Sequence, residues 1–207
     1  MDGNAKMKTV AGLILAAGKS DRMGSPKPLL RIHGKTFLEH IVTEVRRSKV
    51  GQLKVVLGHK AETVLKSLPS LPAEILINPD YHQGQLSSLI TGLQTLQGSS
   101  AEALILFLVD HPFVTCEVVD LLIQQFSQSH SSIVIPTHHG RRGHPVIFGR
   151  QLFSELLHAP LDQGAVLVVR SHQTEILHVE VEDQGILIDI DTPEAYREYV
   201  VEQGIVL

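Results

Sequence analysis

Short apolar runs alternate along the chain with segments in which apolar residues recur at helical spacing. The runs at 10–15 and 104–109 are continuously apolar, as is typical of strands buried on both faces of a parallel sheet. Other short runs predict strands at 53–57, 74–77, 132–135, 146–148, 175–181 and 186–190. Helical spacing predicts intervening helices near 36–48, 61–68, 85–96, 115–129, 151–157 and 165–171. This order predicts a single-domain α/β fold, in which a mostly parallel, twisted sheet has helices on both faces.

Capping signals indicate where some of these helices begin. Thr36 and Glu39 have the spacing of a capping box, which predicts a helix start at 36. Pro193 is favourable in a first helical turn, so a final helix is expected to begin beside Asp191. Asp110 precedes the predicted helix at 115–129. For both aspartates, a plain helix cap is therefore one possible role.

Length and composition restrict the class of protein. The 207 residues suit one domain, which we assign to 1–207 with 1–8 as a flexible N-terminal extension. A net charge of −4 argues against a general nucleic-acid binder. No apolar run approaches the roughly 20 residues that span a bilayer, and the polar first eight residues resemble no signal peptide. A single cysteine, Cys116, fits a reducing compartment. We expect a cytoplasmic protein that binds neither nucleic acid nor membrane.

The segment after the first strand carries the clearest chemical signal. Small residues follow Leu15, so a ligand could lie against the backbone, whose N–H groups could face phosphate oxygens. Three cations, Lys19, Arg22 and Lys27, lie in the same loop and suit phosphate. A P-loop is excluded because its leading glycine would fall at Leu13, and no G-x-G-x-x-G motif follows the strand. The alternative is a cationic surface turn.

Other polar groups follow later strands. Asp110 ends the apolar run at 104–109, and a segment rich in Gly and Ser follows the strand at 74–77. Asp191 lies where the predicted strand at 186–190 becomes the final helix. Because the carboxyl ends of parallel strands meet at one edge of a sheet, we expect these groups to gather there.

These motifs resemble those of nucleotidyltransferases. The run Leu15–Lys27 is similar to the signature L-A-[AG]-G-x-x-x-R-M-G-x-x-K, and the match is closest to the molybdopterin cytidylyltransferase-like branch. Further matches are N-P-x-x-x-x-G-x-x-x-S-L at 78–89, D-x-P at 110–112, G-H-P-V at 143–146, D-x-G-A at 162–165 and I-D-T-P-E at 190–194. The resemblance implies a nucleotide-diphospho-sugar transferase-like, Rossmann-like fold.

The resemblance also implies roles for individual residues. Arg22, Lys27 and Asp110 would be catalytic, Asp110 and Asp191 would hold magnesium, and His144 would contact the acceptor. Asp189, expected to point away from Asp191, is the weaker metal candidate, and His111 is a variable position of the family. Residues expected at the nucleotide are Leu15, Ala16, Ala17, Gly18, Lys19, Arg22, Lys27, Asn78, Gly84, Ser87, Ser88 and Asp110.

The implied reaction is transfer of a nucleoside monophosphate. The form L-A-A-G, with Ala17, favours CTP in this family, and the implied acceptor is molybdopterin or a molybdenum-bearing derivative. A molybdoenzyme or its maturation factor is a further expected partner. Two alternatives stay open: a nucleotidyltransferase for another phosphorylated metabolite or a sugar phosphate, and a noncatalytic nucleotide-binding cofactor chaperone or sensor.

Overall fold

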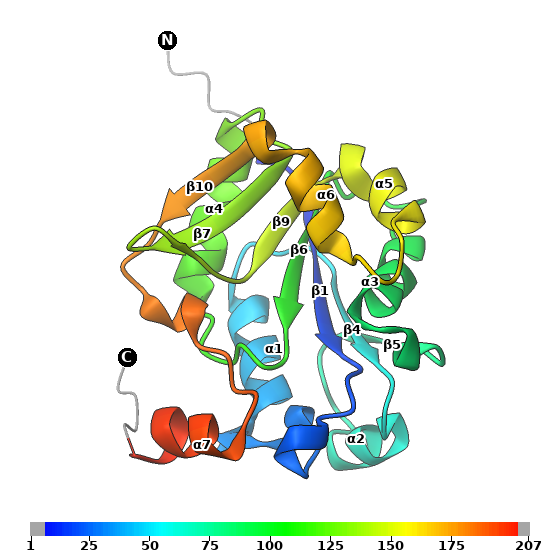
Figure 1. Ribbon diagram of the computed structural model, residues 1–207, viewed down its shortest axis with the longest axis vertical. Coiled ribbons are helices and arrows are strands. Elements are labelled where there is room, and N and C mark those ends of the chain that lie inside the picture. Colours follow the sequence, from blue (N-terminus) through cyan, green and yellow to red (C-terminus); the bar gives the residue numbers. More distant parts are fainter. Residues whose placement is uncertain (1–6, 203–207) are drawn as a thin grey trace.

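A mostly parallel sheet forms the centre of the computed structural model, which describes residues 7–202 (Figure 1). The strands of this sheet are β1 (Val10–Ala16), β4 (Leu53–Leu57), β5 (Glu74–Ile77), β6 (Ala103–Leu108), β7 (Ile133–His138), β8 (Arg141–Arg142), β9 (Val146–Gly149) and β10 (Ile176–Glu180). They are ordered β10-β7-β9-β6-β1-β4-β5, with β8 paired to β7. Among the described strands of this sheet, β8 and β9 pair antiparallel with their neighbours, and β2 (Arg31–Ile32) and β3 (Lys35–Thr36) form a separate small antiparallel ribbon. The predicted α/β class is confirmed.

Helices cover both faces of the sheet, as predicted. They are α1 (Phe37–Arg47), α2 (Ala61–Ser67), α3 (Gln85–Gln94), α4 (Cys116–Gln128), α5 (Phe153–His158), α6 (Ala165–Ser171) and α7 (Pro193–Tyr196), and a π-helical turn over Arg197–Glu202 follows α7. Successive side chains of β1 point to opposite faces of the sheet and pack into two separate hydrophobic cores. Val10 and Ile14 pack with residues of α1 and α4, whereas Leu13 and Leu15 pack with residues of α3, α5 and α6.

Side-chain caps fix the starts of three helices. The capping box predicted at α1 is present, because Thr36 accepts from the Glu39 N–H (3.2 Å) and Glu39 accepts from the Thr36 N–H (2.8 Å). Thr115 caps α4 and Thr192 caps α7. Since these threonines do the capping, a plain helix cap is the wrong role for both Asp110 and Asp191.

The strand predicted at 186–190 is wrong. Residues Gln184–Leu187 form a 3-10 helix, and Asp183 accepts a hydrogen bond from the Gly185 N–H (2.7 Å). Ile186 and Ile190 are buried in the core, which explains the apolar alternation of the sequence. However, the backbone hydrogen bonds of this segment do not follow a strand pattern. The Ile186 carbonyl accepts from the His144 N–H, and the Ile190 N–H donates to the Asp110 carbonyl.

The beginning of the described chain is held against α4. The Lys8 ammonium donates to the carbonyls of Phe126 (3.1 Å) and Ser129 (3.2 Å) and lies 4.3 Å from the centre of the Phe126 ring. The predicted flexible extension therefore does not reach Lys8, and its residues 1–6 lie outside the described part of the chain. Within residues 7–202, no helix has the length and apolar character needed to cross a membrane.

The sheet register brings the carboxyl ends of the central strands together. Ala16 pairs with Leu57 at the end of β4, and Leu15 pairs with Leu108 at the end of β6. Strands β1 and β6 run toward the end of the molecule where α7 lies (Figure 1). The loops that follow these strands are therefore neighbours.

Gly92 lets α3 approach β1 closely. A Cβ at this position would lie 2.3 Å from Cδ2 of Leu13, a fully buried side chain. Overpacking costs about 1–3 kcal/mol, and the better helix propensity of alanine returns up to about 1 kcal/mol. We expect Gly92→Ala to lower the free energy of unfolding by about 1–2 kcal/mol in urea titrations. Gly98→Ala, whose Cβ would meet nothing within 4 Å, is the control and should not destabilise the fold. Equal stability of the two variants would contradict this packing.

Candidate active site

A cavity of about 360 Å³ lies at the carboxyl ends of β1 and β6. The loop after β1, the start of α3, the end of β6 and the segment before α7 all contribute to its wall. Eleven residues predicted as site residues line it: Leu15, Ala16, Ala17, Gly18, Lys19, Arg22, Lys27, Gly84, Ser88, Asp110 and Asp191. The structure thus places segments that are distant in sequence around one hollow.

The loop after β1 folds back on itself and fixes Lys27. Ser20 adopts a left-handed conformation (φ 58°) and its carbonyl accepts from the Met23 N–H (3.0 Å). The Ser20 hydroxyl accepts from the Lys27 N–H (3.1 Å), just before a 3-10 turn over Lys27–Leu29. Lys27 is only 8% exposed, so its ammonium has little water and needs protein partners.

Two aspartates are these partners. The Lys27 Nζ lies 3.0 Å from Oδ2 of Asp110 and also pairs with Oδ1 of Asp191. The second oxygen of Asp191 pairs with the Arg22 guanidinium, which is more exposed. Burial acts to lower the pKa of Lys27, but the two carboxylates outweigh it and the pKa is raised. Burial acts to raise the pKa of Asp191, but Lys27 and Arg22 outweigh it and the pKa is lowered.

The aspartates fit a divalent cation by their chemistry and environment. Hard cations such as Mg²⁺ prefer carboxylate oxygens, and both carboxylates converge on the Lys27 ammonium. Oδ1 of Asp110 is buried without a hydrogen-bond partner, so one oxygen is available to an ion.

Asp189 is not where we expected it. Its carboxylate lies with ligand atoms of Asp110 and His111, all within 4.8 Å of one another. The expectation that it points away from the site assumed a regular strand, which this segment does not form. Burial, together with the charges of Asp110 and Asp191, raises the pKa of Asp189. Asp189 therefore adds to the negative charge of the site without an ion-pair partner among the described residues.

Asn78 and Ser87 lie behind the cavity wall, not on it. Asn78 donates to the hydroxyls of Ser87 (2.9 Å) and Ser88 (3.0 Å), and all three residues are buried. The Ser87 hydroxyl donates to the Gly84 carbonyl (2.7 Å). These bonds tie the start of α3 to the end of β5 and position Gly84 and Ser88. We expected Asn78 and Ser87 to contact the nucleotide directly. Their placement behind the cavity wall does not favour such a contact.

Sequence reasoning missed seven other lining residues, among them Ser20, Tyr81 and Gln85. Tyr81 packs edge-on against His59, with ring centres 5.7 Å apart. Ser20 occupies a variable position of the loop motif, so only its hydrogen bond to Lys27 reveals its role. Tyr81 and Gln85 also occupy variable positions, in the motif over 78–89.

A second cavity of about 470 Å³ adjoins the first and shares Leu15, Gln85 and Leu108 with it. Its walls are mainly apolar, with polar groups from Arg142, His144 and the segment 162–164. Gly143 is required here, because a Cβ would lie 2.5 Å from the Ile186 carbonyl oxygen. Burial, and then the neighbouring His111, lowers the pKa of His144 to about 4, so its imidazole is neutral at pH 7.

Comparisons with known proteins show the family of the chain. The family model described as a MobA-like NTP transferase domain matches residues 12–176. The molybdenum cofactor cytidylyltransferase of Escherichia coli (strain K12) is 26% identical over 193 residues, covering 92% of this chain and 95% of that protein. The nicotine blue oxidoreductase of Paenarthrobacter nicotinovorans is 27% identical over 200 residues, covering 93% and 97%. A probable molybdenum cofactor guanylyltransferase of Bacillus mycoides is 29% identical over 136 residues, 66% of each chain.

Solved structures show the same fold. The crystal structure of Rv0371c from Mycobacterium tuberculosis H37Rv superposes with a TM-score of 0.81 at 27% identity, covering 92% of this chain and 96% of that one. A structure of the same protein in complex with manganese has a TM-score of 0.78 at 25% identity, covering 93% and 98%.

The opposite pKa shifts of Asp191 and Asp189 predict opposite effects of removing their charges. A lowered pKa stabilises the fold above the unfolded value of about 3.9, and this contribution is lost as the pH falls through the native pKa. We expect Asp191→Asn to lower the free energy of unfolding by about 1 kcal/mol at pH 7, and by less toward pH 3. Asp189→Asn should be neutral or stabilising at pH 7, because it removes repulsion. Urea titrations of both variants, in the presence of a chelator and from pH 7 to pH 3, test this prediction. A loss of stability in both variants at pH 7 would contradict the opposite pKa shifts of the two carboxyls.

Proposed function

Because the chain belongs to the MobA-like NTP transferase family and is a nucleotidyltransferase, we propose that it transfers CMP from CTP to a phosphate of a molybdopterin-type acceptor. The observation that carries this proposal is the buried Lys27 ammonium between Asp110 and Asp191, in the cavity that the loop after β1 helps to line. A cation fixed in advance beside two carboxylates is suited to charge that develops on a phosphorus centre.

In this reaction an oxygen of the acceptor phosphate attacks the α-phosphorus of the nucleotide. A new phosphorus–oxygen bond forms, the bond from the α-phosphorus to the oxygen bridging the β-phosphate breaks, and pyrophosphate leaves with the electron pair. Lys27 would stabilise negative charge on the α-phosphate, and Arg22 would bind the leaving pyrophosphate. The backbone N–H groups of the small-residue loop would contact the remaining phosphate oxygens.

The carboxylates of Asp110 and Asp191 would hold the divalent cation, proposed to be magnesium. When bound, such a cation supplies neutralising charge to the triphosphate. The chain's own contribution is to hold both carboxylates beside Lys27, since Thr115 and Thr192 cap the neighbouring helices and these aspartates are not needed as caps. Lys27 is tied at its backbone by Ser20, so its ammonium stays near both carboxylates.

The two adjoining cavities support a two-substrate reaction. The first has the cationic loop and the acidic groups, and the second has apolar walls that suit a flat heterocycle. Arg142 and the neutral His144 would recognise polar groups of the acceptor. The likeness to a cytidylyltransferase over nearly the whole chain and the L-A-A-G sequence favour CTP and molybdopterin.

A screen of pyrophosphate release tests this function. Purified protein with Mg²⁺ is incubated with each of CTP, GTP, ATP and UTP, combined with molybdopterin, sugar phosphates or other phosphorylated metabolites. We expect the fastest release with CTP and molybdopterin. Faster release with another acceptor would favour the alternative nucleotidyltransferase, and nucleotide binding without release would favour a noncatalytic role.

Lys27→Ala should reduce turnover far more than nucleotide binding. Loss of one preorganised electrostatic partner costs on the order of 10²–10³-fold in turnover, whereas Arg22, the backbone and the cation keep most ground-state contacts. Calorimetry with CTP should show a change below about tenfold in the dissociation constant. Lys66→Ala, an exposed lysine on α2, is the control and should match the parent. Thermal unfolding confirms that the variant is folded, and turnover near that of the parent would end the catalytic role of Lys27.

Ala17→Gly should shift the nucleotide preference away from CTP. Ala17 is buried in the cavity wall, and its carbonyl accepts from the His59 N–H (3.0 Å). Loss of its methyl group changes how closely a base can approach the backbone, an effect of about 1–3 kcal/mol at most. The ratio of kcat/KM for CTP and GTP should therefore move toward GTP without full reversal. An unchanged ratio would show that Ala17 does not help to select the base.

A further inference from the structure

Three buried side-chain atoms without a hydrogen-bond partner lie in one place. Within residues 7–202, the buried polar side-chain atoms without a partner are Oδ1 of Asp110, Nδ1 of His111 and Nδ1 of His144. The rings of His111 and His144 are 4.8 Å apart, centre to centre, and Asp110 directly precedes His111. An unpaired buried polar group costs about 1–3 kcal/mol. The chemistry described above gives the Asp110 oxygen to a divalent cation but does not use the two imidazole nitrogens, which therefore indicate a further ligand beside Asp110.

The donor atoms at this point have the separation of metal ligands. Asp110, His111 and Asp189 each offer one ligand atom, and these atoms all lie within 4.8 Å of one another. Metal–ligand bonds of about 2.1 Å allow one ion to bridge them after small side-chain rotations. The other oxygen of Asp110, Oδ2, already faces Lys27, so this group of donors extends away from the Lys27–Asp191 pair.

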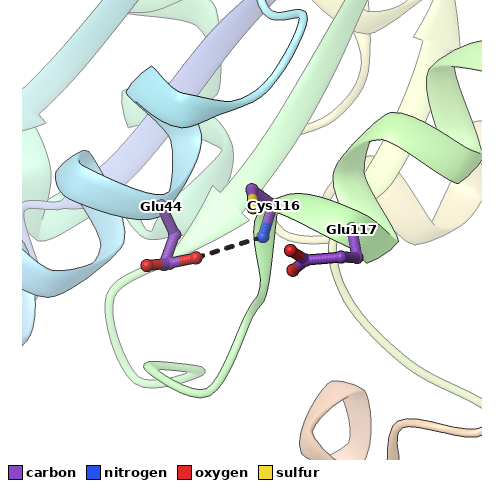
Figure 2. A group of neighbouring side chains, drawn as sticks. All are labelled: Glu44, Cys116 and Glu117. Atoms are coloured by element: carbon purple, nitrogen blue, oxygen red, sulfur yellow. Dashed lines mark hydrogen bonds between the residues drawn. The ribbon is translucent and has the colours of Figure 1, made fainter.

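A second group of possible ligands consists of Glu44, Cys116 and Glu117 (Figure 2). Unlike the first group, it has other roles that account for its side chains. Glu44 accepts from the Cys116 backbone N–H (3.2 Å) and from Arg47 (2.9 Å), so its oxygens serve the start of α4 and a surface ion pair. Burial, and then Glu117, raises the pKa of the Cys116 thiol to about 11, so the thiolate that binds metals is scarce at pH 7. This group is explained by helix capping.

We propose that Asp110, His111 and Asp189 bind a first-row transition-metal ion, at a site distinct from the Asp110–Asp191 position proposed for magnesium. Two carboxylates and an imidazole suit Mn²⁺, Co²⁺ or Zn²⁺, whereas Mg²⁺ prefers oxygen ligands alone. His144 packs against the His111 ring and brings a second imidazole with an unpartnered nitrogen to the site. The proposal goes beyond the proposed function and shares only Asp110 with it.

Cobalt binding by the full chain tests this site without substrates. Protein freed of metal with a chelator is titrated with Co²⁺, and the visible absorption reports coordination. We expect one ion per chain with the absorption of imidazole-bound Co²⁺, and His111→Asn should weaken its affinity by about tenfold or more. Asp191→Asn should retain the ion, because Asp191 is not among its ligands. His178→Asn, an exposed histidine on β10, is the matched control and should bind as the parent does.

A second measurement keeps the proposal testable if His111→Asn fails to fold. Pulsed electron paramagnetic resonance of Mn²⁺ on the unmodified chain should show coupling to an imidazole nitrogen. Absence of that coupling, equal Co²⁺ affinity in parent and His111→Asn, or loss of the ion in Asp191→Asn alone would overturn the proposal. Pyrophosphate release with Mg²⁺ is measured separately, so this failure and failure of the proposed function are distinguishable.

Discussion

The buried ammonium of Lys27 is the constraint on which the rest of the site depends. A cation that is 8% exposed requires anionic partners, and this chain supplies them from positions 83 and 164 residues away in sequence. The loop after β1, the end of β6 and the segment before α7 must therefore meet. Because these charges lie close together, the pKa of Lys27 is raised and the pKa of Asp191 is lowered. The same two carboxylates can balance a lysine or a divalent cation, which links the stability of the site to its chemistry.

Packing around β1 brings these three segments together. Its residues alternate between two cores, so helices cover both faces of the strand, and its carboxyl end reaches the cavity. The parallel register aligns the ends of β1, β4 and β6. Gly92 brings α3 close, and the hydrogen bonds of Asn78 hold the first turn of α3 beside the cavity. Residues that do not themselves line the cavity thus position those that do.

The sequence predicted regular structure well because local signals and burial agreed there. The strands at 53–57 and 74–77 have the predicted bounds, and the capping box at Thr36 is present. The segment 186–190 misled us because its isoleucines alternate into the core, while its backbone bonds to His144 and Asp110 follow no strand pattern. That error also misplaced Asp189. Motif spacing found Lys27, Asp110, Asp191 and Ser88, but it could not show that Asn78, a fixed position of the same motif as Ser88, lies behind the cavity wall. Such differences depend on tertiary contacts.

The central claim is that the Lys27–Asp110–Asp191 group is the centre of nucleotidyl transfer. A crystal structure of the chain with Mg²⁺ and a nonhydrolysable analogue of CTP tests it most directly. The account predicts an α-phosphate oxygen within hydrogen-bond distance of the Lys27 Nζ, with Asp110 and Asp191 coordinating the ion. A nucleotide bound elsewhere, or bound in this cavity with its α-phosphate remote from Lys27, would contradict it.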